Sequence, residues 1–138
     1  RKTREYWMIR VPGRNPSGVM AALEAVRSQY SEHWDDIFKT ITTDNGSEFS
    51  MLSGLEDLSQ TLVYFAHPYT SCEKASVERH NGLIRRFIHK AKRIVSYYDE
   101  QNDQIEIWCN SLPRKLLGYH TPDDLFEDEL DRIYSRVA

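Results

Sequence analysis

The 138-residue chain has few cysteines and no long apolar run. Its two cysteines, Cys72 and Cys109, form no CxxC motif and are too few for a disulfide framework, so we expect reduced thiols. No apolar stretch approaches the roughly 20 residues that a membrane-spanning helix needs. The basic start, residues 1–4, also lacks the apolar segment of a signal peptide. We therefore expect a soluble, cytoplasmic protein that does not associate with a membrane.

A surplus of positive charge is also missing, because 18 Lys and Arg against 21 Asp and Glu give a formal net charge of −3. That balance alone argues against a nucleic-acid binder, since neutralising phosphates takes an excess of basic side chains. The charges lie in blocks, however. Residues 74–93 hold seven basic residues and one acidic residue, whereas residues 15–73 and 99–138 are acidic. Such a basic stripe would attract a phosphate backbone, although on charge alone a solvated helix face is the favoured interpretation.

A packed globule is favoured by the 40% apolar and 12% aromatic content, and the length suits one domain, residues 1–138. Short β-branched segments bounded by turn residues predict strands at residues 5–11, 37–43 and 62–66. Helical spacing and caps predict helices after Asn15, at residues 48–60, 76–95 and 103–111, and after Thr121. This alternation predicts an α/β domain with a largely parallel sheet.

Two carboxylates lie at positions where ligand-binding side chains are expected. Asp44 follows the strand predicted over residues 37–43, and ligands bind at the carboxyl ends of parallel strands. Glu78 lies in the first turn of the basic helix, where it could converge on the same pole. Two carboxylates that share a site repel one another, and a hard cation such as Mg²⁺ relieves the repulsion. Each residue also has a simpler interpretation, since Asp-Asn-Gly is usually a tight turn and such a glutamate is usually a surface residue.

The helix predicted over residues 76–95 strengthens the functional interpretation. At 100° per residue, four polar residues fall within about 40° of one line, and Asn81 flanks them: Glu78, Arg85, His89 and Lys92. Apolar residues, from Val77 to Val95, occupy the opposite stripe. A carboxylate above a column of basic groups suits a metal-assisted attack on a phosphodiester.

Other polar residues support weaker hypotheses. His67, Cys72 and His80 lack the spacing of a zinc site. Arg114 precedes a Lys in a proline-containing loop, where it would contact either phosphate or only solvent. Tyr6 and its neighbours are expected to pack on the sheet.

Four segments carry a family resemblance: ITTDNGSEF (41–49), YFAHPYTS (64–71), VERHNGLIRRF (77–87) and NSLPRKLLGYHTPDDLF (110–126). With these motifs the chain resembles, over nearly its whole length, the catalytic core of bacterial insertion-sequence transposases. The most similar group is the one numbered thirty, within the retroviral-integrase, ribonuclease-H-like superfamily.

The resemblance implies that Asp44 and Glu78 are the second and third members of an Asp-Asp-Glu triad that binds two Mg²⁺ or Mn²⁺ ions. The implied activity is cleavage and strand transfer of transposon-end DNA in the nucleoid, with transposon ends and target DNA as partners. Asn81 and Arg85 match family positions near the DNA. The basic stripe adds further DNA-binding candidates: Arg79, Arg86, Lys74 and Lys92.

The chain departs from the family at its start, because the first aspartate of the triad lies upstream of the segment matching Arg1 to Arg4. The fold expected from the resemblance is therefore an integrase core that lacks its first two strands and carries added C-terminal helices. We expect such a truncated product to be inactive alone and to form a homo-oligomer, for instance a strand-swapped dimer. Two alternatives are a non-catalytic remnant that binds DNA or self-associates, and a ribonuclease-H-like nuclease acting on RNA–DNA hybrids.

Overall fold

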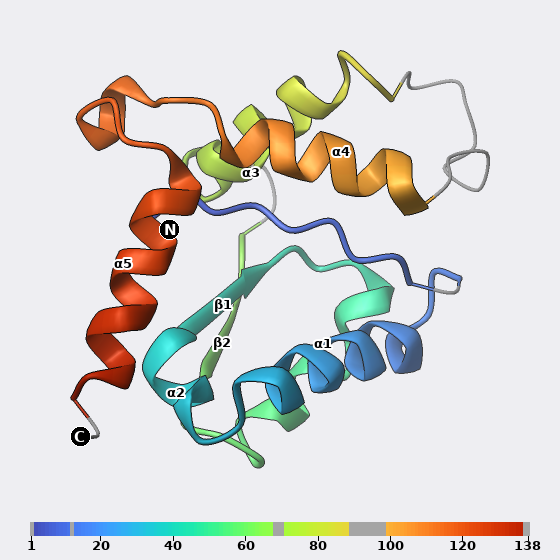
Figure 1. Ribbon diagram of the computed structural model, residues 1–138. Coiled ribbons are helices and arrows are strands. Elements are labelled where there is room, and N and C mark those ends of the chain that lie inside the picture. The colour runs from blue at the N-terminus through green and yellow to red at the C-terminus, as the bar shows by residue number, and fades with distance from the viewer. Residues whose placement is uncertain (1, 12, 68–70, 89–98, 137–138) are drawn as a thin grey trace. The chain divides into compact units, whose positions relative to one another are not determined.

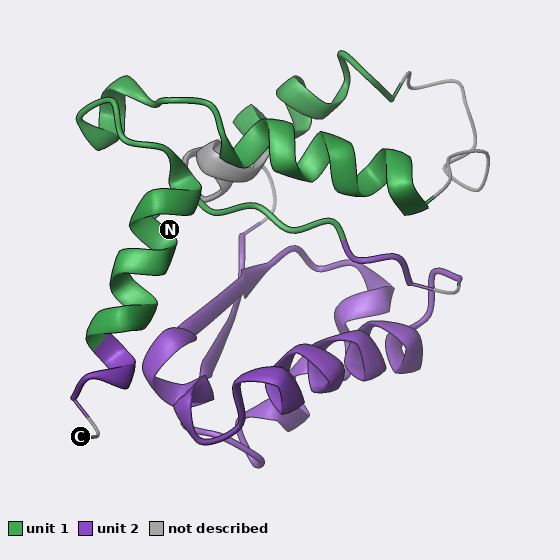
Figure 2. Cartoon of the chain, in the orientation of Figure 1, with its two compact units in different colours: residues 1–8, 74–132 green, residues 9–73, 133–138 purple. Residues whose placement is uncertain are grey.

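The computed structural model describes residues 2–11, 13–67, 71–88 and 99–136, with the side chains of residues 71–77 excepted (Figure 1). The chain divides into two compact units (Figure 2). Unit 1 comprises residues 1–8 and 74–132, and unit 2 comprises residues 9–73 and 133–138. The single domain expected for residues 1–138 stays a prediction. No helix in the described ranges is long and apolar enough to cross a membrane.

Unit 2 begins with helix α1 (Pro16–Tyr30), which starts where the sequence predicted it. Asn15 caps the helix, because its Oδ1 accepts a hydrogen bond from the Gly18 N–H at 2.7 Å. Pro16 occupies the first helical position, where its missing N–H is no loss. The short 3₁₀ helix η1 (Ser31–His33) and helix α2 (Trp34–Ile37) follow, and they bury His33 and Trp34.

A two-stranded parallel sheet forms the centre of unit 2. Strand β1 (Thr40–Thr43) pairs with strand β2 (Leu62–Phe65), with Thr40 opposite Leu62. Both strands were predicted, although β1 is shorter than residues 37–43 because α2 extends to Ile37. Helices with a small parallel sheet confirm the α/β class in outline.

The connection between the strands differs from the α-helix predicted over residues 48–60. It contains two 3₁₀ helices, η2 (Ser47–Phe49) and η3 (Leu52–Leu55). Their hydrogen bonds span three residues, as from the Glu56 N–H to the Ser53 carbonyl at 3.2 Å. Serines and Gly54 have low helix propensity, which explains why an α-helix is not sustained. The connection nevertheless buries Leu52 and Leu55 as part of the core.

Unit 1 contains most of helix α3 (Ser71–Ile84), helix α4 (Asp99–Asn110), the 3₁₀ helix η5 (Lys115–Leu117) and most of helix α5 (Pro122–Tyr134). Helix α4 starts before the predicted residues 103–111. The start of α5 is as predicted, because Thr121 Oγ1 accepts a hydrogen bond from the Asp124 N–H at 3.1 Å.

The strand predicted over residues 5–11 does not form. Side chains of α4 hold this segment in place of a neighbouring strand. Asn110 Oδ1 accepts from the Tyr6 N–H at 3.0 Å, and Asn110 Nδ2 donates to the Tyr6 carbonyl at 2.8 Å. The same Nδ2 donates to Glu5 Oε1 at 2.7 Å. The aromatic and β-branched residues predicted a strand, but one buried amide satisfies the backbone groups that a strand neighbour would satisfy.

Aromatic contacts join this segment to the helices of unit 1. The Tyr6 ring stacks on His80 of α3, with centroids 5.3 Å apart and an interplanar angle of 9°. Trp7 meets the edge of Phe126 of α5 at 5.5 Å. Tyr6 therefore packs against helices and not on a sheet, which corrects the prediction for its side chain.

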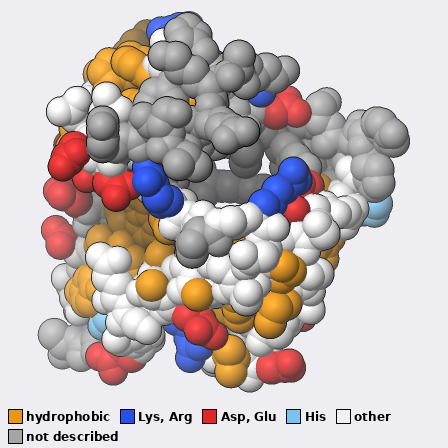
Figure 3. Space-filling model, turned by 90° about the vertical axis from the view of Figure 1, so that its right-hand side faces the viewer, with side chains coloured by type: hydrophobic (Ala, Val, Ile, Leu, Met, Phe, Trp, Pro, Cys, Tyr) orange, Lys and Arg blue, Asp and Glu red, His pale blue; other side chains and the backbone are white. Residues whose placement is uncertain are grey.

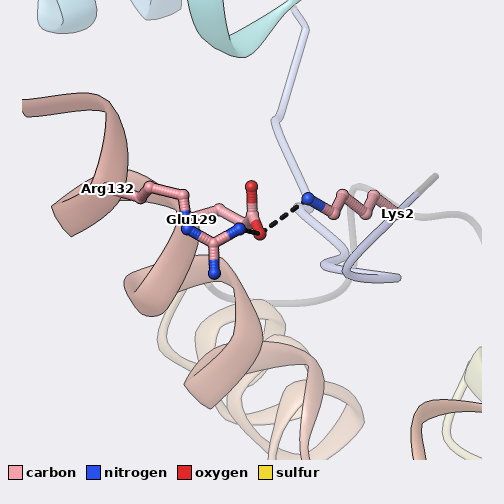
Figure 4. A network of polar contacts seen from close by, with 3 residues as sticks. All are labelled: Lys2, Glu129 and Arg132. Carbon is pink, nitrogen blue, oxygen red and sulfur yellow. Dashed lines mark hydrogen bonds and ion pairs between the residues drawn. The ribbon is translucent and has the colours of Figure 1, made fainter. Parts of the chain in front are cut away.

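One ion pair also joins the N-terminal segment to α5 (Figure 4). Glu129 Oε1 accepts from both Lys2 Nζ and Arg132 Nη1, each at 2.7 Å. Elsewhere, large apolar side chains reach the surface, with Ile107, Leu116 and Tyr119 the most exposed of them. Apolar, acidic and basic side chains are intermingled on the face that Figure 3 shows.

Helix α3 ends earlier than predicted. It stops at Ile84, whereas the sequence predicted a helix over residues 76–95. Beyond Ile84 the regular pattern is interrupted, because the N–H groups of Arg86 and Phe87 donate three residues back, to Leu83 and Ile84, while the Ile88 N–H still donates four residues back, to Ile84 at 2.9 Å. The Phe87 ring then meets the edge of Trp108 of α4 at 4.9 Å, a contact that favours the turn.

A first prediction concerns Asn110. We expect Asn110→Ala to lower the free energy of unfolding by about 2–3 kcal/mol, because it removes three hydrogen bonds and leaves the Tyr6 backbone unsatisfied. Denaturant unfolding measures the change. Asn102→Ala is the matched control, because Asn102 is also buried on α4 but its Oδ1 has no partner in the described part of the chain. Equal losses in the two variants would contradict this role of Asn110.

A second prediction concerns Glu5, whose pKa is raised from 4.5 to about 7, first by burial and then by the charge of Asp123. A raised pKa in the folded state stabilises the fold at low pH, and this stabilisation is lost as the pH rises from about 4.5 through about 7. The contribution is of the order of 1 kcal/mol after allowance for solvent screening. Unfolding measured against pH should show a weaker loss for Glu5→Gln. The exposed Glu100→Gln should keep the wild-type slope, and a wild-type slope in Glu5→Gln would contradict the assignment.

Candidate functional site

The turn after β1 carries Asp44 and is held by three hydrogen bonds. Asp44 Oδ1 accepts from the Gly46 N–H at 3.3 Å, as in a tight Asx turn. Asn45 Nδ2 donates to the carbonyl of Ala66 at 3.1 Å, and the Ala66 N–H donates to the Thr43 carbonyl at 2.7 Å. Ala66 directly follows β2, so these bonds join the carboxyl ends of both strands at the residue next to Asp44.

Asp44 itself is exposed at this strand end. The turn that the simpler interpretation predicted is therefore present. Its position at the carboxyl ends of two parallel strands is also where a ligand-binding carboxylate was expected. The tight turn and the ligand-binding role are compatible, because the turn presents the carboxylate.

Glu78 lies on α3 in unit 1, and its side chain is exposed. Arg79 and Asn81 are exposed on the same helix, while His80 between them is buried against Tyr6. His80 therefore packs inside unit 1. The packing of His80 leaves its neighbours along the helix accessible.

Arg85 and Arg86 are exposed as well, but they lie in the turn after α3. The N–H of Arg85 still donates to the Asn81 carbonyl at 3.1 Å, so Arg85 directly follows α3, and its predicted alignment with Glu78 stays a prediction. Lys74 lies within α3, although its side chain is not among those described. Lys92, together with His89, lies outside the described residues.

Asp44 belongs to unit 2 and Glu78 to unit 1. Each carboxylate is accessible within its own unit. Their convergence on one site stays a prediction.

Glu48 is a residue that the sequence argument missed. Its Oε1 accepts from Arg14 Nε at 2.7 Å, and its Oε2 is buried without a hydrogen-bond partner in the described part of the chain. The Arg14 hydrogen bond, as the largest cause, lowers the pKa of Glu48, while the charge of Asp44 opposes this shift. The only signal in the sequence was the position of Glu48 four residues after Asp44 in the segment DNGSEF.

The oxygens of this turn suit a hard divalent cation in their chemistry. Asp44 offers an exposed carboxylate, and the Glu48 carboxylate beside Gly46 adds a second negative charge. Carboxylate oxygens are the ligands that Mg²⁺ and Mn²⁺ prefer. Within the described ranges, no group of three or more His, Cys, Asp and Glu side chains is arranged to hold a metal ion. The chemistry of the Asp44 carboxylate therefore suits such a cation as one ligand among several.

Arg114 has a structural contact. Its Nη2 donates to the Cys109 carbonyl at 2.8 Å, and so satisfies an open carbonyl in the last turn of α4. Cys109 is a buried free thiol, as expected, and burial raises its pKa. The phosphate contact considered for Arg114 thus competes with an existing contact.

Three relatives are similar to the chain. It is 33% identical over 133 residues to the transposase for insertion sequence element IS4351 of Bacteroides fragilis, covering 96% of this chain and 39% of that protein. It is 42% identical over 89 residues to a probable transposase for insertion-like sequence element IS1161 of Streptococcus salivarius, covering 64% and 25%. It is 27% identical over 127 residues to the transposase InsI for insertion sequence element IS30A of Escherichia coli strain K12, covering 92% and 32%.

The chain thus spans about two fifths of the length of the first of these relatives, and less of the other two. No protein-family profile matches it.

Proposed function

Since the chain is homologous to part of the insertion-sequence transposases, including those of the IS30 group, we propose that it serves DNA transposition as part of a catalytic core. The observation that carries this proposal is the similarity to transposases over nearly the whole chain. The fold that we propose is the ribonuclease-H-like integrase core. Support for it comes from the parallel pairing of β1 with β2 and from the position of Asp44 directly after β1.

In this proposal Asp44 and Glu78 supply carboxylate oxygens for Mg²⁺ or Mn²⁺, together with a third carboxylate. When bound, two such ions activate an attacking oxygen and stabilise the leaving oxygen of the DNA backbone. The part of this chain is to hold Asp44 at the strand end, through the Gly46 N–H and the Asn45 bond to Ala66. Glu78 is presented by the exposed side of α3, whose buried residue His80 fixes which side faces outward.

DNA is the partner that the exposed residues of α3 and the following turn favour. Arg79, Asn81, Arg85 and Arg86 are all exposed within a short segment. Arginine binds phosphate oxygens through two parallel N–H donors. Side-chain amides such as that of Asn81 also contact the DNA backbone. Lys74 and Lys92 are further candidates from the sequence.

Self-association is part of the same proposal, because a two-stranded sheet has open edges that can pair with strands of another copy. The outer edge of β2 is partly closed, since Glu56 Oε1 accepts from the Val63 N–H at 2.7 Å. Strand exchange through the outer edge of β2 would therefore have to displace this Glu56 hydrogen bond.

A third prediction tests the DNA contacts. We expect the double variant Arg85→Ala, Arg86→Ala to bind duplex DNA more weakly and to lower the slope of log affinity against log salt by about 2, roughly 0.9 per lost phosphate contact. Binding isotherms at several salt concentrations measure this slope. The control is Arg136→Ala, an exposed arginine outside the segment. An unchanged slope in the double variant would count against these contacts.

A fourth prediction tests the carboxylates in the complete transposase that carries these residues. Asp44→Asn and Glu78→Gln should each reduce Mg²⁺-dependent or Mn²⁺-dependent cleavage and joining of labelled transposon ends to background, while DNA affinity persists, because each removes a cation ligand. The exposed Asp128→Asn serves as the control. Full activity in either site variant would refute its assignment.

The same assay separates the alternative functions. A remnant that only binds DNA would show binding and no cleavage in the unaltered protein. A ribonuclease-H-like nuclease would cut RNA–DNA hybrids and leave transposon ends unjoined.

A further inference from the structure

The proposed function does not explain the ion pair between Arg14 and Glu48. The pair joins the segment before α1 to the turn after β1, with 2.7 Å between Arg14 Nε and Glu48 Oε1. Its two members differ in exposure: the Glu48 side chain keeps 12% of its accessible surface and that of Arg14 keeps 81%. An ion pair with one member so exposed contributes little to stability. The main effect of the ion pair is therefore to hold the Glu48 side chain in place.

Glu48 folds back over Gly46 towards Asp44. A Cβ atom on Gly46 would lie 2.7 Å from Glu48 Oε2 and 3.1 Å from Asp44 Oδ1. Both carboxylates thus lie close to the same point beside Gly46. The backbone of Gly46 has φ −64° and ψ 141°, a conformation that any residue adopts. A side chain at position 46 would therefore require the Glu48 carboxylate to move, although the backbone angle itself would tolerate it.

Arg14, Glu48 and Asp44 together carry one positive and two negative charges. Arg14 neutralises Glu48 through Oε1, and Oε2 has no hydrogen-bond partner in the described part of the chain. Asp44 and Glu48 carry like charges beside Gly46 and therefore repel each other. The hydrogen bond from Arg14 to Glu48 offsets part of that repulsion. A divalent cation near Asp44 would then experience two negative charges and one more distant positive charge.

We propose that Glu48 is a positioning residue for Asp44: held by Arg14, it fixes the Asp44 turn and strengthens the binding of a divalent cation by Asp44. The inference rests on the proposed function, in which Asp44 is a cation ligand. Two effects act together. Contact with Glu48 restricts the turn that presents Asp44, and the negative charge of Glu48 raises the local affinity for a cation.

The test uses Mn²⁺ alone, without DNA, and follows paramagnetic broadening of the Asn45 and Gly46 amide NMR signals. Glu48→Gln keeps the shape and an acceptor for Arg14 but removes the charge, so we expect roughly fivefold to tenfold weaker binding of Mn²⁺. The charge swap Arg14→Glu, Glu48→Arg restores an ion pair and places a positive charge beside Asp44. It should bind Mn²⁺ more weakly still. Glu24→Gln, an exposed change on α1, should bind as the unaltered chain does.

The outcomes distinguish this inference from the proposed function. If Asp44→Asn abolishes the broadening while Glu48→Gln and the charge swap bind Mn²⁺ normally, the role of Glu48 is refuted and that of Asp44 stands. If Asp44→Asn broadens as the unaltered chain does, the assignment of Asp44 fails, and with it the inference. A purely structural ion pair would make the charge swap equal to the unaltered chain. No broadening in the unaltered chain at millimolar Mn²⁺ would overturn the role of Glu48.

Discussion

The parallel pairing of β1 with β2 is the constraint on which the candidate site depends. Parallel strands cannot be joined by a tight hairpin. The chain must therefore cross from the carboxyl end of β1 back to the amino end of β2. The crossover supplies Leu52 and Leu55 to the core, and at its start it forms the turn that carries Asp44. The hydrogen bond from Asn45 to Ala66 then ties this turn to the end of β2. Asp44 is thus presented by the two strands together.

In unit 1, buried polar groups join the N-terminal segment to the helices. Asn110 of α4 binds the backbone of Tyr6, and the Tyr6 ring stacks on His80 of α3. One residue of an extended segment therefore joins two helices. With His80 held inside, Glu78 and Arg79 are left on the outer side of α3. In unit 2 the Arg14–Glu48 ion pair lies beside Gly46, and we propose that it positions Asp44.

Local signals in the sequence predicted much of the fold. Asn15 and Thr121 cap α1 and α5 as their side-chain chemistry indicated, and β-branched segments with flanking turns marked β1 and β2. The incorrect predictions concern segments whose structure depends on contacts with residues far away in the sequence. The segment around Tyr6 has strand propensity but meets the Asn110 amide, and α3 ends where Phe87 can meet Trp108. The sequence placed Asp44 at a strand end, but the role of Glu48 depends on Arg14, 34 residues away. Local patterns carry no information on such a pair.

The proposed function requires Asp44 and Glu78 to hold the same divalent cations, which the position of a bound ion along the chain tests directly. Fe²⁺ substituted for Mg²⁺, with ascorbate and peroxide, cleaves a polypeptide near the bound ion, and the fragments locate the ion along the chain. The account predicts cuts at two places, beside Asp44 and beside Glu78, and the loss of both in Asp44→Asn. Cuts near only one of the two carboxylates, or at neither, would contradict it.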